Sequence, residues 1–262
     1  MHMKSGESAG SRVRTPSYRP AAKQPAAGYR PAADAVPVIT AGGAGQAWQA
    51  LVEAVGDQLD GRERLWVLEA GAGYSTLFDL PEDAYIVGVG GDSDALERNV
   101  RLDERVVAEL ADYLPGAAGF DLITCWYGLD GVPRAATLLD RFAAWTALGG
   151  LVVLALPNLR SPLGLGRYLR GAARLRRGVT PAAVRRRFAA RGFAPVFQAY
   201  FEDPLQAEGR HRRGISHGRW RATQIAVRVL SLGQLDAART DYIVVFRRHE
   251  YPPNLFSGRP DS

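Results

Sequence analysis

The segment Leu65-Trp-Val-Leu-Glu-Ala-Gly-Ala-Gly73 joins a short apolar run to a glycine-rich turn, and its acid, Glu69, stands two residues before the first glycine. A continuous apolar run of this length indicates a strand that is buried on both faces of a sheet. Gly71 and Gly73 have no Cβ, so the chain can turn tightly and a ligand can lie against the backbone. A second glycine-rich element, Gly88-Val-Gly-Gly-Asp92, follows the next apolar run. Together the two elements predict a nucleotide-like ligand at the carboxyl edge of a parallel sheet.

Short apolar runs alternate with segments of helical periodicity along most of the chain. The runs that predict strands are 65–68, 85–89, 105–107, 120–126, 151–156, 195–201 and 241–246. The segments that predict helices are 46–59, 94–100, 133–148, 181–191 and 219–232. Thr180 followed by Pro181 is typical of a helix start, and Gly192 of a helix end. This alternation predicts a doubly wound α/β fold with a mostly parallel sheet.

Composition limits the class of protein. The chain has 262 residues, of which 47% are hydrophobic, and this is enough for one large folded domain. No apolar run approaches the length of a membrane-spanning helix, so we expect no membrane insertion and a cytoplasmic location. The single cysteine, Cys125, predicts neither a disulfide framework nor a structural zinc site, and we expect no metal.

The two ends of the chain differ from its middle. Residues 1–36 are rich in Pro, Ala and Arg, and they contain the pentapeptide Tyr-Arg-Pro-Ala-Ala twice, starting at Tyr18 and Tyr29. Such a composition is typical of a flexible tail. We therefore expect a tail over 1–36, a folded domain over 37–250 with a partly helical, substrate-side segment over 159–232, and a C-terminal tail over 251–262.

From about Leu65 to Arg248 the sequence resembles the class I S-adenosylmethionine-dependent methyltransferases, especially the type 11 and type 12 small-molecule branch. The resemblance rests on these segments: the first glycine loop at 69–73, residues 88–99, 109–115, 120–126 and 148–158. It implies a Rossmann-like sheet of seven strands with the final two antiparallel, and S-adenosylmethionine as cofactor. It also implies that Glu69, Ala70, Gly71 and Gly73 contact the methionine part of the cofactor, and that Glu109 with Leu110 meets the adenine.

The sequence departs from this family where an acid normally closes the second strand and holds the ribose hydroxyls, because Gly90 stands at that position. Loss of that carboxylate should weaken cofactor binding by about 1 to 3 kcal/mol. Asp92 is the candidate replacement, since the two glycines before it allow the chain to bend back. Alternatively, Asp92 caps the helix that begins near Ser93.

Two further departures follow from the same resemblance. Residues 129–132 read Leu-Asp-Gly-Val where family members often have Leu-Glu-His-Val, so the usual histidine is absent. Pro81 comes only eight residues after Gly73, which leaves room for little more than one turn of the usual long first helix.

Methyl transfer from a sulfonium is an in-line displacement, so it depends mainly on orientation and requires no catalytic triad. A general base is needed only when the acceptor carries a proton of high pKa, and His217 is the candidate, with a solvated basic loop as the alternative. Tyr127 could orient an acceptor or pack in the core. Trp126 could cover the cofactor, with a cation–π contact to the sulfonium, or be structural. Asn158 and Arg160 would border the acceptor pocket, although Asn158 could instead satisfy loop backbone.

Arginines supply nearly all of the positive charge in a chain of net charge +6. They recur at 167, 170, 174, 176, 177 and 185–187. This pattern is typical of solvated helix faces, and the alternative is an anionic substrate or an acidic carrier protein that delivers a tethered substrate. We expect no nucleic acid, because aromatic residues are not interleaved with the basic run.

The sequence therefore predicts an enzyme that transfers a methyl group from S-adenosylmethionine to a small molecule, at an oxygen of a secondary metabolite. The first alternative is a methyltransferase fold repurposed as a cyclase, with the cofactor structural or absent. The second is a non-catalytic partner subunit. Gly90 and Gly131 favour the cyclase, since both stand where the family has functional side chains.

Overall fold

The computed structural model describes residues 38–40, 44–62, 64–116, 119–129, 132, 134–158, 161, 180–201, 239 and 241–249. Its strands are β1 (Val38–Thr40), β2 (Trp66–Ala70), β3 (Tyr85–Gly90), β4 (Glu104–Val107), β5 (Phe120–Trp126), β6 (Thr146–Pro157), β7 (Phe193–Phe201) and β8 (Asp241–Arg248). Its helices are α1 (Ala44–Leu59), α2 (Ser93–Arg98), α3 (Ala135–Trp145) and α5 (Pro181–Ala189). The predicted helix 219–232 and both predicted tails lie outside the described residues.

These strands form one sheet in the order β1-β7-β8-β6-β5-β2-β3-β4. Among the described strands, only β8 runs antiparallel to its neighbours, which are β6 and β7. The predicted mostly parallel sheet with antiparallel last strands is therefore confirmed, and each antiparallel pair among the described strands includes β8. β1 adds an eighth strand that the sequence did not predict, and it pairs in parallel with β7.

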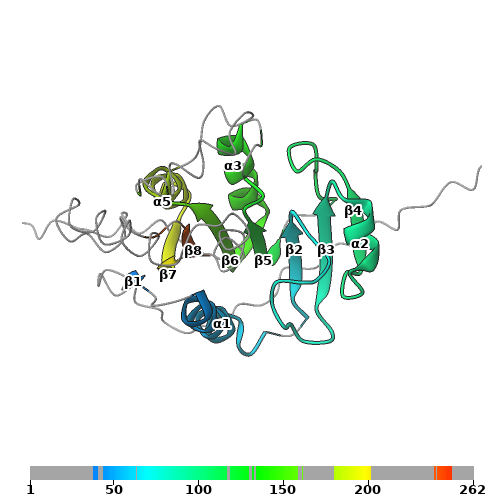
Figure 1. Ribbon diagram of the computed structural model, residues 1–262, viewed down its shortest axis with the longest axis horizontal. Helices are drawn as coiled ribbons and strands as arrows, with labels where there is room; N and C mark the ends of the chain where they lie inside the picture. The colour runs from blue at the N-terminus through cyan, green and yellow to red at the C-terminus, as the bar shows by residue number, and fades with distance from the viewer. Residues whose placement is uncertain are drawn as a thin grey trace, which may run out of the picture.

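Helices cover both faces of the sheet, as Figure 1 shows for α1 on one side and for α3 and α5 on the other. The α1 side buries Leu51 and Val55 against Val67, Ile86 and other β-strand residues. The opposite side buries residues of α3 and α5, such as Leu139, Phe142 and Phe188. Strands buried on both faces explain why the predicted runs are continuously apolar.

Local signals in the sequence set several element boundaries. The hydroxyl of Thr180 accepts a hydrogen bond from Ala183 N at 3.2 Å, and Pro181 begins α5. Gly192 follows this helix with a φ of +80°, which a glycine adopts without strain. The helix predicted over 133–148 is shorter, because the chain passes directly from Trp145 into β6, where Thr146 pairs with Phe120.

The connection from β2 to β3 is the main departure from the expected architecture. Residues 71–84, all of which the structure describes, contain no helix, where the sequence predicted room for about one turn. Phe78 and Leu80 from this connection are buried on the α1 side of the sheet, and Phe78 stacks on Trp48 at 5.6 Å between ring centroids. The loop thus covers the sheet with side chains in place of a helix. None of the helices in the described part of the chain is long and apolar enough to span a membrane.

Candidate functional site

The register of the sheet brings the predicted cofactor residues to one edge. Ala70, at the end of β2, is paired with Val89 on β3 and with Cys125 on β5. Gly90 ends β3 beside Val107 of β4, and Glu109 and Leu110 follow β4. Because these strands are parallel, the loops after them gather at their shared carboxyl edge, where open α/β sheets bind ligands.

The first glycine loop is fixed to the end of β3. The amides of Gly71 and Ala72 both donate to the carbonyl oxygen of Val89, at 2.8 and 3.0 Å. Gly71 has a φ of +86°, and a Cβ there would lie 3.5 Å from the Cα of Gly128, in the loop after β5. The loops after β2 and β5 are therefore in van der Waals contact, and glycine suits position 71 because of its positive φ.

Glu69 is buried directly before this loop, and its Oε1 accepts a hydrogen bond from Leu77 N at 2.7 Å. Burial raises the pKa of Glu69, and the hydrogen bond from Leu77 opposes that rise. The carboxylate thus holds the helix-free connection between β2 and β3. Because residues 71–84 form no helix, the loop itself provides no helix N-terminus for a ligand.

The end of β3 has no room for a side chain. A Cβ on Gly90 would lie 2.9 Å from the carbonyl oxygen of Ala72. Asp92 is exposed and is the N-cap of α2, where its Oδ1 accepts from Ala95 N at 3.1 Å. The capping interpretation of Asp92 is therefore confirmed, whereas its contact with a ribose stays a prediction.

Glu109 and Leu110 point to different surroundings. Glu109 is exposed, and its Oε1 lies 3.9 Å from the position that a Cβ on Gly91 would occupy. Leu110 is buried, with its Cδ1 3.2 Å from the Cβ position of Gly128 and 4.0 Å from that of Gly71. Leu110 thus packs against the loops that contain Gly71 and Gly128, and Glu109 places a carboxylate at the surface beside the end of β3.

Two neighbouring aromatic residues follow each other at the end of β5. Trp126 packs edge-on against Trp48, with 5.6 Å between ring centroids, and also against Tyr127. Tyr127 has a φ of +57°, which is uncommon for a residue with a side chain. Its hydroxyl donates to Oδ1 of Asp241 at 2.8 Å. This hydrogen bond between Tyr127 and Asp241 joins the end of β5 to the start of β8.

Sequence reasoning did not identify Asp241, which is fully buried. The signal was present, because Asp241 begins an otherwise apolar run, and a buried carboxylate needs polar partners. The antiparallel direction of β8 puts this start at the carboxyl edge of the parallel strands.

Asn158 is also fully buried, just after β6. Its side-chain Nδ2 donates to the backbone carbonyl oxygen of Arg239 at 2.9 Å. The backbone carbonyl oxygen of Asn158 accepts from Ser161 N at 3.0 Å. The structure thus shows the loop-backbone contacts expected as one alternative for Asn158, and its contact with substrate stays a prediction. Arg160 and His217 lie outside the described residues.

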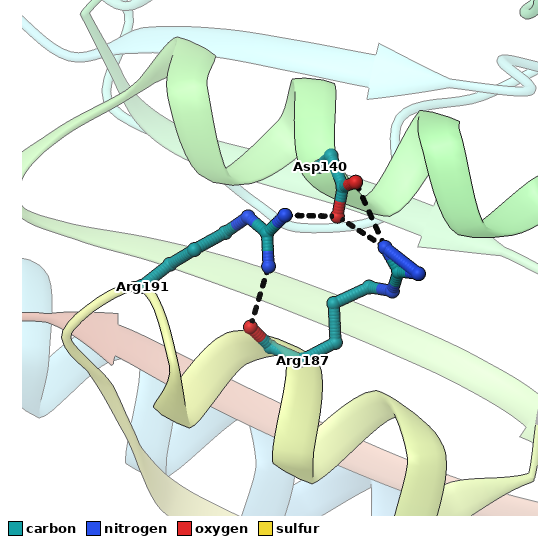
Figure 2. Close-up of polar contacts among 3 residues, drawn as sticks. All are labelled: Asp140, Arg187 and Arg191. Carbon is teal, nitrogen blue, oxygen red and sulfur yellow. Dashed lines mark hydrogen bonds and ion pairs between the residues drawn. The ribbon is translucent and has the colours of Figure 1, made fainter.

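Part of the arginine-rich sequence has partners within the fold. Figure 2 shows Arg187 and Arg191 of the α5 region directed at Asp140 of α3, with contacts of 2.7 and 2.8 Å. Arg185 donates to Gln198 of β7 at 3.0 Å. These arginines join α5 to α3 and to the sheet, while positions 167–177 lie outside the described residues.

The residues at the carboxyl edge fit a nucleoside ligand such as S-adenosylmethionine. A Cβ on Gly73 would meet no other atom within 4 Å, and one on Gly91 would meet only Glu109, so the backbone there is open. Open glycine backbone allows close approach of a ligand, and the Glu109 carboxylate can accept hydrogen bonds from its hydroxyls. At this edge, Gly90 departs from the family pattern because it offers no carboxylate to the ribose.

Comparison with known proteins agrees with this fold. A family model described as a methyltransferase domain matches residues 43–198, more than half of the chain. No curated protein matches the sequence.

Several solved structures share the architecture. A SAM-dependent methyltransferase from Archaeoglobus fulgidus has a TM-score of 0.52 and 15% identity, with 76% of this chain and 92% of that chain covered. A chain from a complex of the Haloferax volcanii Trm112 methyltransferase activator with a methyltransferase has a TM-score of 0.54 and 13% identity, with 79% and 91% covered. The cyclase SpnF has a TM-score of 0.48 and 15% identity, with 78% and 82% covered. At these identities the likenesses to the first two structures show the fold alone.

Proposed function

This chain belongs to the methyltransferase family whose domain model it matches, and we propose that it transfers the methyl group of S-adenosylmethionine to an oxygen atom of a small-molecule acceptor. The observation that supports this best is the carboxyl edge of the sheet. There the Gly71 loop approaches Gly128 closely, and the Glu109 carboxylate lies beside open backbone at Gly91. We further propose that the acceptor is a secondary metabolite and that the enzyme acts in the cytoplasm.

The cofactor would be held by residues from three loops. Ala70, Gly71 and Gly73 would let its amino-acid end lie against the backbone, and the buried carboxyl of Glu69 would support that loop through Leu77. Leu110 would border the adenine, and Trp126 would face the sulfonium, which a cation–π contact favours. The sulfonium supplies an activated methyl group and its leaving group, so the chain needs mainly to orient the acceptor.

The acceptor side would be formed where β5, β6 and β8 meet. Tyr127 is held by its hydrogen bond to Asp241. Asn158, directly after β6, is bonded to the carbonyl oxygen of Arg239, just before β8. An acceptor hydroxyl that gives its proton to the Tyr127 oxygen would allow this phenol to pass its own proton to Asp241 Oδ1. His217 is the alternative general base, and Arg160 would bind the acceptor.

A direct test is transfer of a deuterium-labelled methyl group. The full chain is incubated with labelled S-adenosylmethionine and a panel of phenols, alcohols and carboxylic acids, and the products are analysed by mass spectrometry. We expect a labelled ether or ester together with S-adenosylhomocysteine. Asp241→Asn should slow the reaction of alcohols and phenols, and Asp140→Asn, a matched change away from this edge, should not.

The second candidate function is a cyclase on the same fold, and the closed space at Gly90 favours it. Because a Cβ there would lie only 2.9 Å from the Ala72 carbonyl oxygen, the end of β3 has no room for the usual carboxylate. A protein that binds S-adenosylmethionine weakly or not at all, and that transfers no label to any acceptor, would support this candidate instead.

A further inference from the structure

The end of β3 can supply no acid from its own last residue. A Cβ at Gly90 would lie 2.9 Å from the Ala72 carbonyl oxygen. The Ala72 amide donates a hydrogen bond to the carbonyl oxygen of Val89 at 3.0 Å, and the Gly71 amide donates to that Val89 oxygen at 2.8 Å. A side chain at position 90 would therefore require the glycine loop to move.

Asp92 is the next acid along the chain, and the helix uses it. Its Oδ1 accepts from Ala95 N at 3.1 Å, and α2 is only six residues long. A capping side chain contributes about 1 kcal/mol to a helix, and a short helix depends on it strongly. Turning Asp92 toward a ligand would remove this cap.

Glu109, which follows the neighbouring strand β4, places its side chain beside the end of β3. Ala108 N donates to Gly90 O at 3.0 Å, so the chain after β4 stays attached to the end of β3. The carbonyl oxygen of Glu109 accepts from Asp112 N and Tyr113 N, which fixes its backbone. Its Oε1 then lies 3.9 Å from the Cβ position of Gly91, and no other atom comes within 4 Å of that position.

Leu110 anchors the backbone next to Glu109. Its buried side chain fills the space beneath Gly71 and Gly128, so the residue before it faces the surface. The exposed Glu109 carboxylate thus borders open backbone at the carboxyl end of β3. In open α/β sheets an acid near this edge accepts hydrogen bonds from a ribose, and a carboxylate has enough lone pairs for both hydroxyls.

We infer that Glu109 accepts the hydrogen bonds of the two ribose hydroxyls of the cofactor, while Asp92 serves as the cap of α2. This inference rests on the proposed function, since it requires that the chain binds S-adenosylmethionine. It changes the role expected for Glu109 from adenine contact to ribose contact, and it leaves Leu110 beside the adenine. The cofactor would keep its ribose contact although Gly90 offers no carboxylate.

The test compares two ligands, S-adenosylhomocysteine and its 2′-deoxy analogue, by isothermal titration calorimetry on the full chain. Wild type should bind the ribose form about 10- to 100-fold more tightly than the deoxy form, as expected for a hydrogen bond to a charged group. Glu109→Gln should bind the ribose form about 10- to 100-fold more weakly than wild type and should lose most of the preference between the two ligands. Circular dichroism checks that the variant is folded, as its exposed position predicts.

Asp92→Asn is the matched control, because asparagine caps helices as well as aspartate does but carries no charge. It should keep both the affinity and the preference of wild type. A preference retained in Glu109→Gln, or lost in Asp92→Asn, would overturn the inference while leaving the proposed function intact. Failure of wild type to bind either ligand would overturn the proposed function and the inference with it.

Discussion

Replacement of Gly90 by alanine would place a methyl group 2.9 Å from the carbonyl oxygen of Ala72. The atom that it meets is backbone, and it cannot turn away as the end of a flexible side chain would. The Gly71 and Ala72 amides, both bonded to Val89 O, resist movement of the loop. Overpacking of this kind costs about 1 to 3 kcal/mol. Since 1 kcal/mol corresponds to about 2–4 °C in a chain of this size, the melting temperature should fall by several degrees.

Urea denaturation followed by circular dichroism measures this loss, with two glycine controls in the same protein. Gly73→Ala adds a methyl group with no atom within 4 Å and should change the free energy of unfolding by less than about 0.5 kcal/mol. Gly56→Ala, on the exposed side of α1 with equally open space, should stabilise the protein by about 0.5–1 kcal/mol. A Gly90→Ala variant as stable as wild type would refute the packing of the Ala72 carbonyl against β3, and with it the reason why position 90 carries no acid.

Three other changes test contacts at and around the site. Tyr127→Phe removes the 2.8 Å hydrogen bond to buried Asp241. In urea denaturation it should lower the free energy of unfolding by about 1–3 kcal/mol. An unchanged free energy would show that this hydrogen bond does not stabilise the fold. Burial raises the pKa of Glu69 above its ordinary 4.5, so the folded chain holds the carboxyl proton more tightly than the unfolded chain does. The free energy of unfolding therefore falls as the pH rises above 4.5, until the raised pKa of the folded state is passed. Melting curves across this pH range should show a smaller fall of the melting temperature for Glu69→Gln, and parallel profiles of the two proteins would contradict the assignment. Asp140→Ala removes the partly exposed partner of Arg187 and Arg191, and it should cost at most about 1 kcal/mol for each ion pair, less at high salt. A larger, salt-independent loss of stability in urea would show that these contacts are not mainly electrostatic.

The sheet could be predicted from the sequence because its strands are buried on both faces. Runs such as 120–126 and 151–156 are apolar without interruption, and this pattern together with the helices between them is typical of doubly wound folds. β1 could not be predicted, because three residues carry too little periodicity and its pairing with β7 depends on a contact distant in sequence. The sequence also predicted that the connection after Gly73 was too short for the usual helix, but not that Phe78 and Leu80 would cover the sheet instead.

The candidate site was predictable where function depends on backbone. Gly71 was identified because a tight turn requires glycine, and its φ of +86° shows that turn, whereas the approach of a ligand to its backbone stays a prediction. The position of a carboxylate was less predictable, since it depends on which neighbours already use it. Asp92 offered two interpretations, and only the contact with Ala95 N showed that it caps a helix. Asp241 was missed because its partner, Tyr127, is more than one hundred residues away in the sequence.

The central claim is that this glycine-rich edge binds S-adenosylmethionine. Isothermal titration calorimetry of the purified, ligand-free full chain with S-adenosylmethionine and with S-adenosylhomocysteine tests it most directly, after mass spectrometry has checked for a co-purified nucleoside. We predict saturable binding of both ligands with micromolar dissociation constants, despite the glycine at position 90. The absence of binding heat with either ligand, together with the absence of a co-purified nucleoside, would contradict the claim.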